Sequence, residues 1–262
     1  MNAWMMNGLF ALVFLLVATG LFFFVVTRGA LLLRSLSSNQ SDTSHVYPIY
    51  SNMGLIKLVD FQPIISAILL FQYHRLVSKI VGDLEASNLK NKTVLITSCA
   101  FGNVIPRVVD ASVKAGANRV LVADVVQNEL THARSKLGQY AGTMEYIESN
   151  ATAMNQKDGI AQANILFFLL HELPHPMKIQ AMAEAGRLLA PGGKLYLAEF
   201  HKPRLWVLKV LSWTYFKVFE PLGLALWDTH DPLNCLEAMG GWTCQRSTYF
   251  FGNFQVITAT KL

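Results

Sequence analysis

The chain has 262 residues, which is enough for one α/β domain with an appended segment. Hydrophobic residues make up 52% of it and charged residues only 15%, an apolar composition for a soluble enzyme. The formal net charge of +5 is not gathered into a run of Lys and Arg, and this argues against a nucleic-acid-binding protein. Cys99, Cys235 and Cys244 form no CxxC pair, so we interpret them as reduced thiols.

The apolar residues are concentrated at the N-terminus. Residues 1–27 carry no charged side chain, and residues 8–27 are long enough to cross a bilayer as a helix of about 20 residues. Arg28 and Arg34 follow at once, so the positive-inside rule places the rest of the chain on the cytoplasmic side, or on the matrix side of a mitochondrial inner membrane. A cleaved signal peptide is the alternative, but a basic start and a small-residue cleavage site are lacking. We predict a single-pass inner-membrane anchor over residues 1–34.

The remainder divides into a linker and one domain. Residues 35–45 are polar and rich in serine, which is typical of a linker. Residues 46–262 are predicted to form the domain. Within it, Leu55–Val59 and Pro63–Val81 favour helices, the second with a proline at its start.

From Lys92 onward, short β-branched runs alternate with helical stretches, as in an α/β sheet. Parallel strands are predicted at Thr93–Thr97, Arg119–Ala123, Met144–Ile147, Ile165–Leu170 and Lys194–Glu199. The intervening helices are predicted at Val104–Ala115, Asn128–Leu137 and Lys178–Leu189. Near the end, Thr243–Phe250 and Phe254–Thr260 favour a hairpin. The predicted architecture is a Rossmann-like, seven-stranded sheet with a C-terminal antiparallel hairpin.

Ligands of such sheets bind at the carboxyl ends of the strands. There, Asp124 is expected to accept both ribose hydroxyls of a nucleoside, with a helix N-cap as the alternative. Asn150 and Ala151 follow the third strand, where an Asn amide oxygen can accept from an adenine amino group. Residues 98–103 stand where a glycine-rich nucleotide loop belongs, yet Gly102 is the single glycine among them.

The richest polar cluster follows the fourth strand. His171, Glu172 and His175 come just after a buried run, and Glu199 and His201 end the neighbouring strand. Imidazole and carboxylate together can bind a divalent metal such as Mn²⁺ or serve as acid and base, and a structural role for His171 is also open. A second polar group, interpreted as a helix cap with loop hydrogen bonds, comprises Asp228, His230 and Asp231.

Residues 203–227 are aromatic and sparsely charged. Pro221 and several charged residues make a second membrane span unfavourable. Trp206, Trp213, Tyr215 and Trp227 suit a bilayer interface or an apolar substrate tunnel, with ordinary core packing as the alternative.

Several segments between residues 46 and 262 together resemble one family, the rhodoquinone-biosynthesis methyltransferase-like proteins, which are relatives of the ubiquinone and menaquinone C-methyltransferases. The segments are 71–76, 167–174, 196–203, 219–227 and 248–255. The His-Glu-Leu-Pro and Pro-Gly-Gly elements are generic to the class I S-adenosylmethionine (SAM) methyltransferase fold. The closing Tyr-Phe-x-Gly-x-Phe-Gln and the His-x-Pro after the fifth strand are more specific to the family.

The resemblance implies an enzyme that uses SAM and a divalent metal, Mn²⁺, to replace a ring methoxy group of ubiquinone by an amino group. A degenerate first loop is usual in that family. By position, the SAM-binding residues are Cys99, Ala100, Phe101, Gly102, Asn103, Asp124, Asn150 and Ala151. The residues facing the quinone or the metal are Tyr73, His171, Glu172 and His201, and the implied metal ligands are His171, Glu172 and Glu199. The implied partners are ubiquinone or a related quinone, membrane lipid and quinone-biosynthesis proteins.

Two alternatives stay open, of which the first keeps the enzyme class and changes the reaction, and the second is not an enzyme. One is a SAM-dependent C- or O-methyltransferase that acts on a quinone or another lipid. The other is a catalytically degenerate methyltransferase-like domain that serves as a scaffold in a quinone-synthesis complex. Binding of SAM separates the scaffold from both enzymes.

Overall fold

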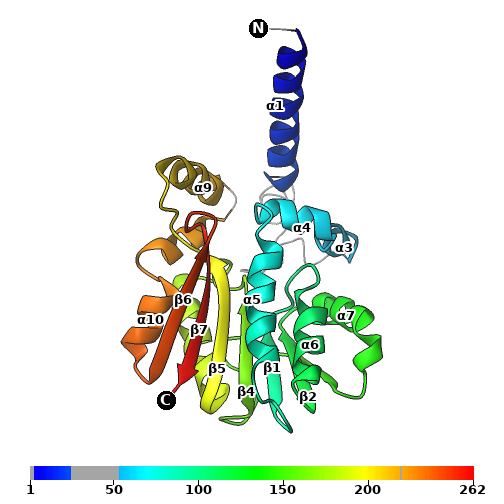
Figure 1. Cartoon of the computed structure of the whole chain (residues 1–262), viewed down its shortest axis with the longest axis vertical. Coiled ribbons are helices and arrows are strands. Elements are labelled where there is room, and N and C mark those ends of the chain that lie inside the picture. Colours follow the sequence, from blue (N-terminus) through cyan, green and yellow to red (C-terminus); the bar gives the residue numbers. More distant parts are fainter. Residues whose placement is uncertain (1–2, 25–52, 219) are drawn as a thin grey trace, which may run out of the picture.

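A computed structural model describes residues 3–24, 53–218 and 220–262 of the chain. Its centre is a seven-stranded sheet with the strand order β3-β2-β1-β4-β5-β7-β6 (Figure 1). The first five strands run parallel, and β7 pairs antiparallel with both β5 and β6. The predicted Rossmann-like sheet with its C-terminal hairpin is confirmed.

The strands are β1 (Thr93–Thr97), β2 (Arg119–Asp124), β3 (Met144–Glu148), β4 (Ala161–Phe167), β5 (Leu189–Phe200), β6 (Trp242–Tyr249) and β7 (Phe254–Lys261). Apolar side chains of β1, β2 and β4 are buried on both faces, which explains their continuous apolar sequence. β4 ends three residues earlier than predicted, because Phe168 adopts a left-handed φ of 54° and turns the chain out of the strand.

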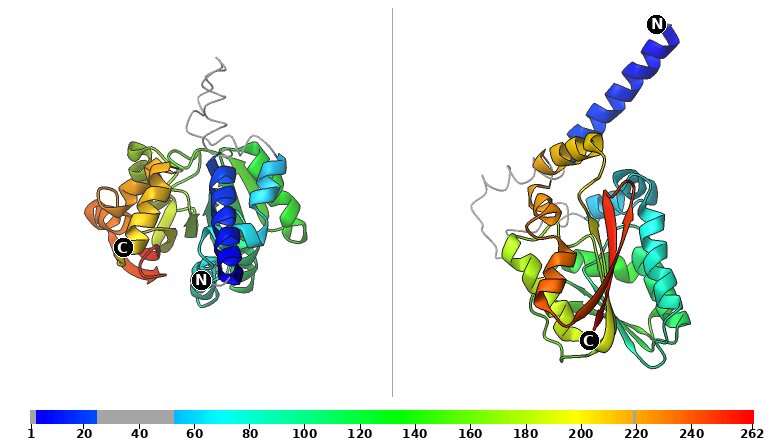
Figure 2. Two further views of the ribbon diagram at one scale, coloured as in Figure 1. Left: turned by 90° about the horizontal axis from the view of Figure 1, so that it is seen from above. Right: turned by 60° about the vertical axis from the view of Figure 1, so that its left-hand side comes forward.

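The helices are α1 (Ala3–Phe24), α3 (Met53–Val59), α4 (Gln62–Ile68), α5 (Tyr73–Glu85), α6 (Val104–Lys114), α7 (Gln127–Lys136), α8 (His175–Leu188), α9 (Trp206–Val218) and α10 (Pro232–Met239), with 3₁₀ turns η3 (Gly138–Tyr140) and η4 (Pro221–Trp227). Buried residues of α5 and α6 pack in one apolar cluster, and those of α8 and α10 pack in a second. The two clusters cover opposite faces of the sheet, giving the three-layer arrangement seen in Figure 2.

The helix predicted over Pro63–Val81 is wrong in one respect, because it is two helices. Leu70 and Phe71 take left-handed φ values of 49° and 58°, which a right-handed helix does not contain. The axes of α4 and α5 therefore bend by 99°. This turn places α4 across the top of the sheet (Figure 1), where Gln62 contacts the loop that follows β1.

The predicted membrane anchor coincides in part with α1. Within the described ranges, no single helix is both long and apolar enough to span a membrane, and the α4–α5 pair meets that requirement only jointly. The anchor thus stays a prediction. The proposed linker at residues 35–45 lies outside the described residues.

Candidate functional site

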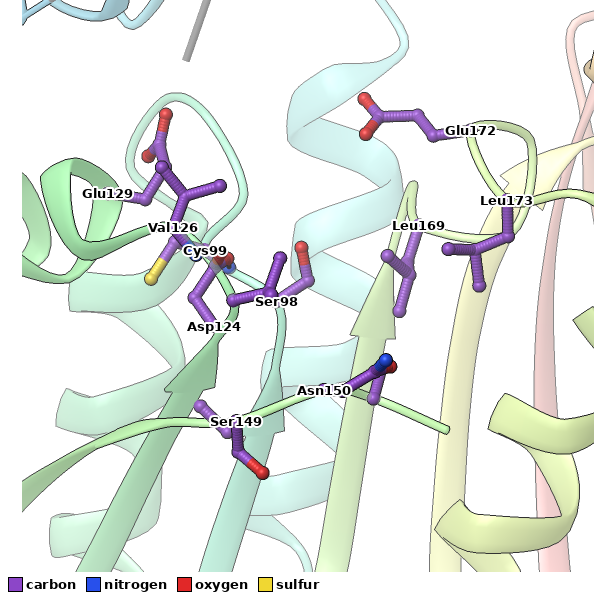
Figure 3. Close-up of a pocket in the computed structure, with 13 residues that line it drawn as sticks. Ser98, Cys99, Asp124, Val126, Glu129, Ser149, Asn150, Leu169, Glu172 and Leu173 are labelled. Carbon is purple, nitrogen blue, oxygen red and sulfur yellow. Dashed lines mark hydrogen bonds between the residues drawn. The ribbon is translucent and has the colours of Figure 1, made fainter. Parts of the chain in front are cut away.

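A polar pocket opens at the carboxyl ends of the parallel strands (Figure 3). Ser98 and Cys99 follow β1, Asp124 ends β2, and Ser149, Asn150 and Ala151 follow β3. Leu169, Glu172 and Leu173 follow β4, and Glu129 approaches from α7. The topology thus brings together four predicted site residues that lie far apart in sequence, namely Cys99, Asp124, Asn150 and Glu172.

Asp124 organises the base of this pocket. One carboxylate oxygen accepts the backbone N–H of Cys99 at 2.6 Å, and the other accepts that of Val126 at 2.8 Å. Burial raises the pKa of this carboxyl, and the two backbone hydrogen bonds oppose that rise. A carboxylate oxygen has a second acceptor site, so the same group can still accept a ligand hydroxyl.

The side of the pocket that was predicted to receive an adenine follows β3. Asn150 and Ala151 both line it, as predicted. The Asn150 side-chain oxygen accepts the backbone N–H of Thr152 at 3.0 Å and its hydroxyl at 2.9 Å, which fixes the turn. Ala151 contributes only a methyl group, so the floor of the pocket stays flat beside that amide.

The loop after β1 has the backbone shape of a nucleotide loop despite its missing glycines. Ser98 takes a φ of 79° and Gly102 a φ of 81°, so a non-glycine residue occupies one of the two left-handed positions. Ala100 is partly buried against the main apolar cluster, and Cys99 is buried. Burial and the nearby Asp124 carboxylate raise the pKa of the Cys99 thiol, which makes a thiolate nucleophile there unfavourable.

Two side chains from the N-terminal helices occupy the N–H groups of this loop. The N–H of Gly102 donates to an Asp60 carboxylate oxygen at 2.8 Å, and that of Asn103 donates to the Gln62 side-chain oxygen at 3.2 Å. In the glycine-rich loops that bind nucleotides, such N–H groups are left for the ligand. Here the protein itself supplies the acceptor oxygens.

Asp60 lies against two basic side chains of α7. Its carboxylate lies 2.7 Å from Lys136 Nζ and 3.1 Å from His132 Nε2. Lys136 also donates to the carbonyl oxygen of Gly102 at 3.1 Å. No local motif in the sequence marks Asp60, Gln62, His132 or Lys136. The partners in the hydrogen bonds of Asp60 and Gln62 are about forty or more positions away along the chain.

Tyr73 lies over the loop and not over an open substrate chamber. Its side chain is fully buried, and its hydroxyl donates to the Phe101 carbonyl oxygen at 3.2 Å. A Cβ placed on Gly102 would come within 2.5 Å of that hydroxyl. Tyr73 therefore explains why a glycine is required at this position, and its ring also packs edge-on against Phe167.

Glu129 is a pocket residue that the sequence analysis did not identify. It is 3% exposed, lines the pocket, and within the described residues its Oε1 has no hydrogen-bond partner. Figure 3 shows it across the pocket from Glu172. Burial, reinforced by the charge of Asp124, raises the pKa of Glu129 to about 8. Glu129 lies in the first turn of a polar helix, where an acidic side chain is usually on the surface. No pattern in the sequence therefore marks it as a pocket residue.

Replacing Glu129 with glutamine is expected to stabilise the protein at alkaline pH. The folded protein holds the Glu129 proton up to about pH 8, whereas the unfolded chain releases it near its ordinary pKa, so stability falls as the pH rises between those values. Glutamine cannot ionise and removes that loss. Thermal unfolding followed across this range should show a flatter pH dependence for Glu129→Gln than for the native chain. An exposed control, Glu148→Gln, should leave the slope unchanged, and an unaltered slope in Glu129→Gln would contradict the assignment.

His171 and Glu199 form a buried ion pair. His171 Nδ1 and the His171 backbone nitrogen lie 3.0 and 3.1 Å from one Glu199 oxygen, and Nε2 lies 3.9 Å from Glu172. Burial lowers the pKa of His171, but the charge of Glu199 and the hydrogen bond to it dominate and raise it to about 9. The imidazole is therefore a cation and a proton donor at neutral pH.

Lys178 fixes the loop that carries this histidine. It is fully buried and donates to the carbonyl oxygens of Leu170 at 2.5 Å and Leu173 at 2.7 Å. Burial lowers the pKa of Lys178 to about 8. The Lys178 ammonium closes the ends of a turn that would otherwise leave two buried carbonyl groups unpaired.

His201 is directed to the C-terminal hairpin instead of the pocket. Its Nδ1 donates to the Gly252 carbonyl oxygen at 2.6 Å, and its Nε2 lies 3.2 Å from an Arg246 nitrogen. Burial lowers the pKa of His201, so the ring is neutral. The structure does not bring His201 together with His171. Arg246 in turn pairs with Asp231, whose side chain caps α10 as predicted.

The side chains proposed as manganese ligands do not form a metal centre. Within the part of the chain that the structure describes, no group of three His, Cys, Asp or Glu side chains gathers in a way that could hold a metal ion. His171 and Glu199 bind each other, and Glu172 stands to one side. The predicted Mn²⁺ site at His171, Glu172 and Glu199 is not supported.

Comparison with known sequences decides the family. The sequence model of the ubiE/COQ5 methyltransferase family matches residues 57–236, more than half of the chain. The chain belongs to the ubiE/COQ5 methyltransferase family. Two similar relatives are ubiquinone/menaquinone biosynthesis C-methyltransferases, from Salmonella arizonae (26% identical, 62% of this chain, 63% of that protein) and from Bartonella quintana (28% identical, 59% of each). The chain thus spans about six tenths of the length of these relatives.

Solved structures agree on the fold. A SAM-dependent methyltransferase described as putative, from Methanococcus maripaludis, superposes with a TM-score of 0.54 at 14% identity over 84% of this chain and 95% of that one. The N-methyltransferase NodS from Bradyrhizobium japonicum, in complex with S-adenosyl-L-homocysteine, gives a TM-score of 0.52 at 13% identity over 78% of this chain and 90% of that one. At such identities they show a class I SAM methyltransferase fold alone.

The residues of this ubiE/COQ5 member fit SAM unequally. At the nucleoside end, the Asp124 carboxylate offers acceptor sites beside an open pocket, as a ribose requires, whereas both lone pairs of the Asn150 side-chain oxygen are taken by Thr152. At the amino-acid end, Asp60 already holds the N–H of Gly102. The ribose position at Asp124 therefore fits the cofactor, and the loop would hold the amino-acid part of SAM by different contacts.

Proposed function

We propose that this chain is a membrane-anchored, SAM-dependent enzyme that modifies ubiquinone or a related quinone by exchanging a ring methoxy group for an amino group, which forms rhodoquinone. Membership of the ubiE/COQ5 family supports the quinone class. The sequence resemblance to the rhodoquinone-forming proteins supports the reaction. The apolar residues 8–27 followed by Arg28 support the anchor and a catalytic domain on the cytoplasmic or matrix side.

One observation carries the proposal: the pocket keeps its nucleoside end, while its first loop is altered. A methyltransferase must aim the SAM methyl group at the substrate, and the loop normally sets that aim. In this chain Asp60, Gln62 and Tyr73 engage the loop from outside. A changed loop supports a changed pose of the amino-acid part of SAM, and with it chemistry other than methylation.

The exchange needs a nucleophile, a proton donor and no redox step. An amine of the ammonia class, supplied as a co-reactant, adds to the ring carbon that bears the methoxy group and forms a C–N bond, and SAM is not consumed in this step. The C–O bond to the methoxy group then breaks, methoxide takes a proton as methanol, and the nitrogen loses the excess proton. The oxidation state of the quinone does not change. The His171 imidazolium, held by Glu199, is suited to protonate the leaving group or to polarise a quinone oxygen.

The test is mass spectrometry of quinones extracted from a ubiquinone-producing host that makes no rhodoquinone and expresses this chain. The expected product has amino in place of methoxy, and it should be absent with the Asp124→Asn variant. A quinone that gains a methyl group from methyl-labelled SAM would replace this proposal by C- or O-methylation. An unchanged quinone pool with the protein folded in the membrane fraction would favour the scaffold.

The pH profile should report the His171–Glu199 pair. If His171 acts as the proton donor, the rate should fall as the pH rises through about 9, where the imidazolium loses its proton. Glu199→Gln removes the charge that sustains that pKa, so the alkaline limb should move to lower pH. His171→Gln should remove the limb altogether. An alkaline limb that is unchanged in Glu199→Gln would show that another group donates the proton.

The manganese dependence implied by the resemblance is tested by chelation. No step above uses a metal, so purified protein treated with a chelator is expected to retain cofactor binding and its thermal stability. Product formation should be compared before chelation, after it and after Mn²⁺ is added back. Recovery only with Mn²⁺ would show that product formation depends on the ion.

A further inference from the structure

A second, apolar cavity of about 250 Å³ lies apart from the polar pocket. Its walls come from four places: the turn between α4 and α5, the end of β5, the inner side of α9, and the end of the C-terminal hairpin. The residues used below are Leu70 from the turn, Leu208, Leu211 and Tyr215 from α9, Phe250 from the hairpin, and Phe200 at the end of β5. The lining is almost entirely aliphatic and aromatic, so the cavity suits an apolar ligand.

The cavity opens onto an exposed apolar surface. Leu211 lines the cavity and is also 61% exposed. Beside it, the Trp206, Phe71 and Phe251 side chains are 76%, 75% and 59% exposed. These residues come from α9, the α4–α5 turn and the hairpin tip, which meet at one end of the molecule (Figure 1). We call them the apolar end.

Both turns at this end carry backbone strain. Leu70 and Phe71 have φ values of 49° and 58°, and Phe250 and Phe251 have values of 46° and 52°. Bulky residues in this region cost about 1 to 2 kcal/mol each, and glycine or asparagine is usual there. Two turns that are unrelated in sequence thus hold aromatic rings out into solvent. Such strain is typical of a site completed by another molecule.

The surface chemistry indicates a lipid bilayer as that partner. On the outer side of α9, Trp206 and Trp213 alternate with Lys209 and Lys217, and Lys217 Nζ lies 5.6 Å over the Trp213 ring. Tryptophan with interspersed lysine is typical of helices that lie in a membrane interface with anionic lipids. The apolar helix α1 extends beyond the same end (Figures 1 and 2).

The inner end of the cavity leads towards the catalytic candidates. Phe200 lines the cavity, and its ring lies edge-on to His171 with 5.0 Å between ring centroids. His171 precedes Glu172, which lines the polar pocket. An apolar chain lying in the cavity would therefore bring an attached ring towards His171 and the cofactor pocket.

We propose that the apolar end rests on an anionic bilayer and that the cavity receives the apolar tail of a membrane-dissolved substrate. The identity of the head group rests on the function proposed above. The bilayer contact and the tail site rest on the apolar end itself. The substrate would enter from the membrane at the α9 side, tail in the cavity and ring towards His171.

Bilayer contact is tested by labelling the full chain at Phe251→Cys with an environment-sensitive dye, in a Cys235→Ser, Cys244→Ser background. In phosphatidylcholine–phosphatidylglycerol vesicles containing brominated lipid, quenching is expected at this site. The matched control is Gly142→Cys, in the loop before β3 at the opposite end of the sheet. Equal quenching at both sites, or none at Phe251→Cys, would overturn the contact. Burial of that dye without lipid, together with dimer formation, would assign the surface to a second copy.

The tail site is tested with a polyprenyl alcohol, which has a tail but no quinone ring. Leu208→Trp fills the cavity and is expected to weaken binding of this probe at least about tenfold, the loss of a few buried methylene groups. Val207→Trp, one residue along and outward-facing, should bind as the native chain does. Equal affinity of the two variants would overturn the tail site. Because the probe carries no ring, its binding is independent of whether the quinone reaction occurs.

Discussion

Asp124→Asn is expected to weaken SAM binding by at least about thirtyfold, the value of one hydrogen bond to a charged group of about 2 kcal/mol. The substitution removes the ribose acceptor. It also turns an amide donor towards the N–H of Cys99 or Val126, so the loop after β1 loses its anchor. Calorimetric titration with SAM measures the loss directly, and product formation should fall with it.

The control for this variant is Glu145→Gln. Glu145 is an acid on neighbouring β3, where it pairs at the surface with Arg119 at 2.6 Å. Losing such an exposed pair should leave SAM affinity within about twofold. If Asp124→Asn binds SAM as well as Glu145→Gln does, the ribose assignment is wrong.

Gly102→Ala is expected to destabilise the protein by about 2 to 4 kcal/mol, from a left-handed backbone and a steric clash together. The new Cβ would stand 2.5 Å from the Tyr73 hydroxyl and 2.8 Å from the ring carbon that bears it. Either Tyr73 or the loop must move. Chemical denaturation measures the change in unfolding free energy, and SAM binding should weaken in parallel.

A double-mutant cycle separates the clash from the backbone effect. Tyr73→Phe removes the nearest atom, so Gly102→Ala should cost less in that background than in the native chain. Gly82→Ala is the matched control, since its Cβ would meet nothing within 4 Å in the middle of α5. It should be neutral or stabilising by up to about 1 kcal/mol. Equal costs of Gly102→Ala in both backgrounds would exclude the Tyr73 contact.

Sequence pattern was sufficient for the sheet and for one end of the pocket. The apolar runs of β1 and β2 predict buried strands, and the structure has them there. Because β2 ends at Asp124, the topology alone places that carboxylate at the carboxyl edge of the sheet, where ligands bind. The same rule located Asn150 and Glu172 correctly in the pocket. These predictions depend on periodicity and on strand order, which are encoded locally.

The remaining features depend on contacts between distant segments. Leu70 and Phe71 are residue types that helices readily contain, so nothing in the local sequence marks their left-handed φ values or the bend between α4 and α5. His201 looked equivalent to Glu199 as a strand-end residue, but β5 ends at Phe200, and His201 lies in the following loop, where its Nδ1 donates to the carbonyl oxygen of Gly252. His171 Nδ1 is paired with Glu199, and within the described residues His171, Glu172 and Glu199 do not gather into a group that could hold a metal ion.

The contact between Asp60 and the loop after β1 couples two free energies, that of docking α3 and α4 onto the domain and that of binding the cofactor. Asp60 directly follows α3, and its carboxylate bridges the N–H of Gly102 and the ammonium of Lys136. Any cofactor that reorders this loop must therefore change the free energy of docking α3 and α4, and the docked helices must change cofactor affinity by the same factor. Amide hydrogen exchange in α3 would report that coupling as protection that depends on SAM. Occupancy of the cofactor pocket is in this way communicated to the first helices of the domain that follow the proposed anchor and linker.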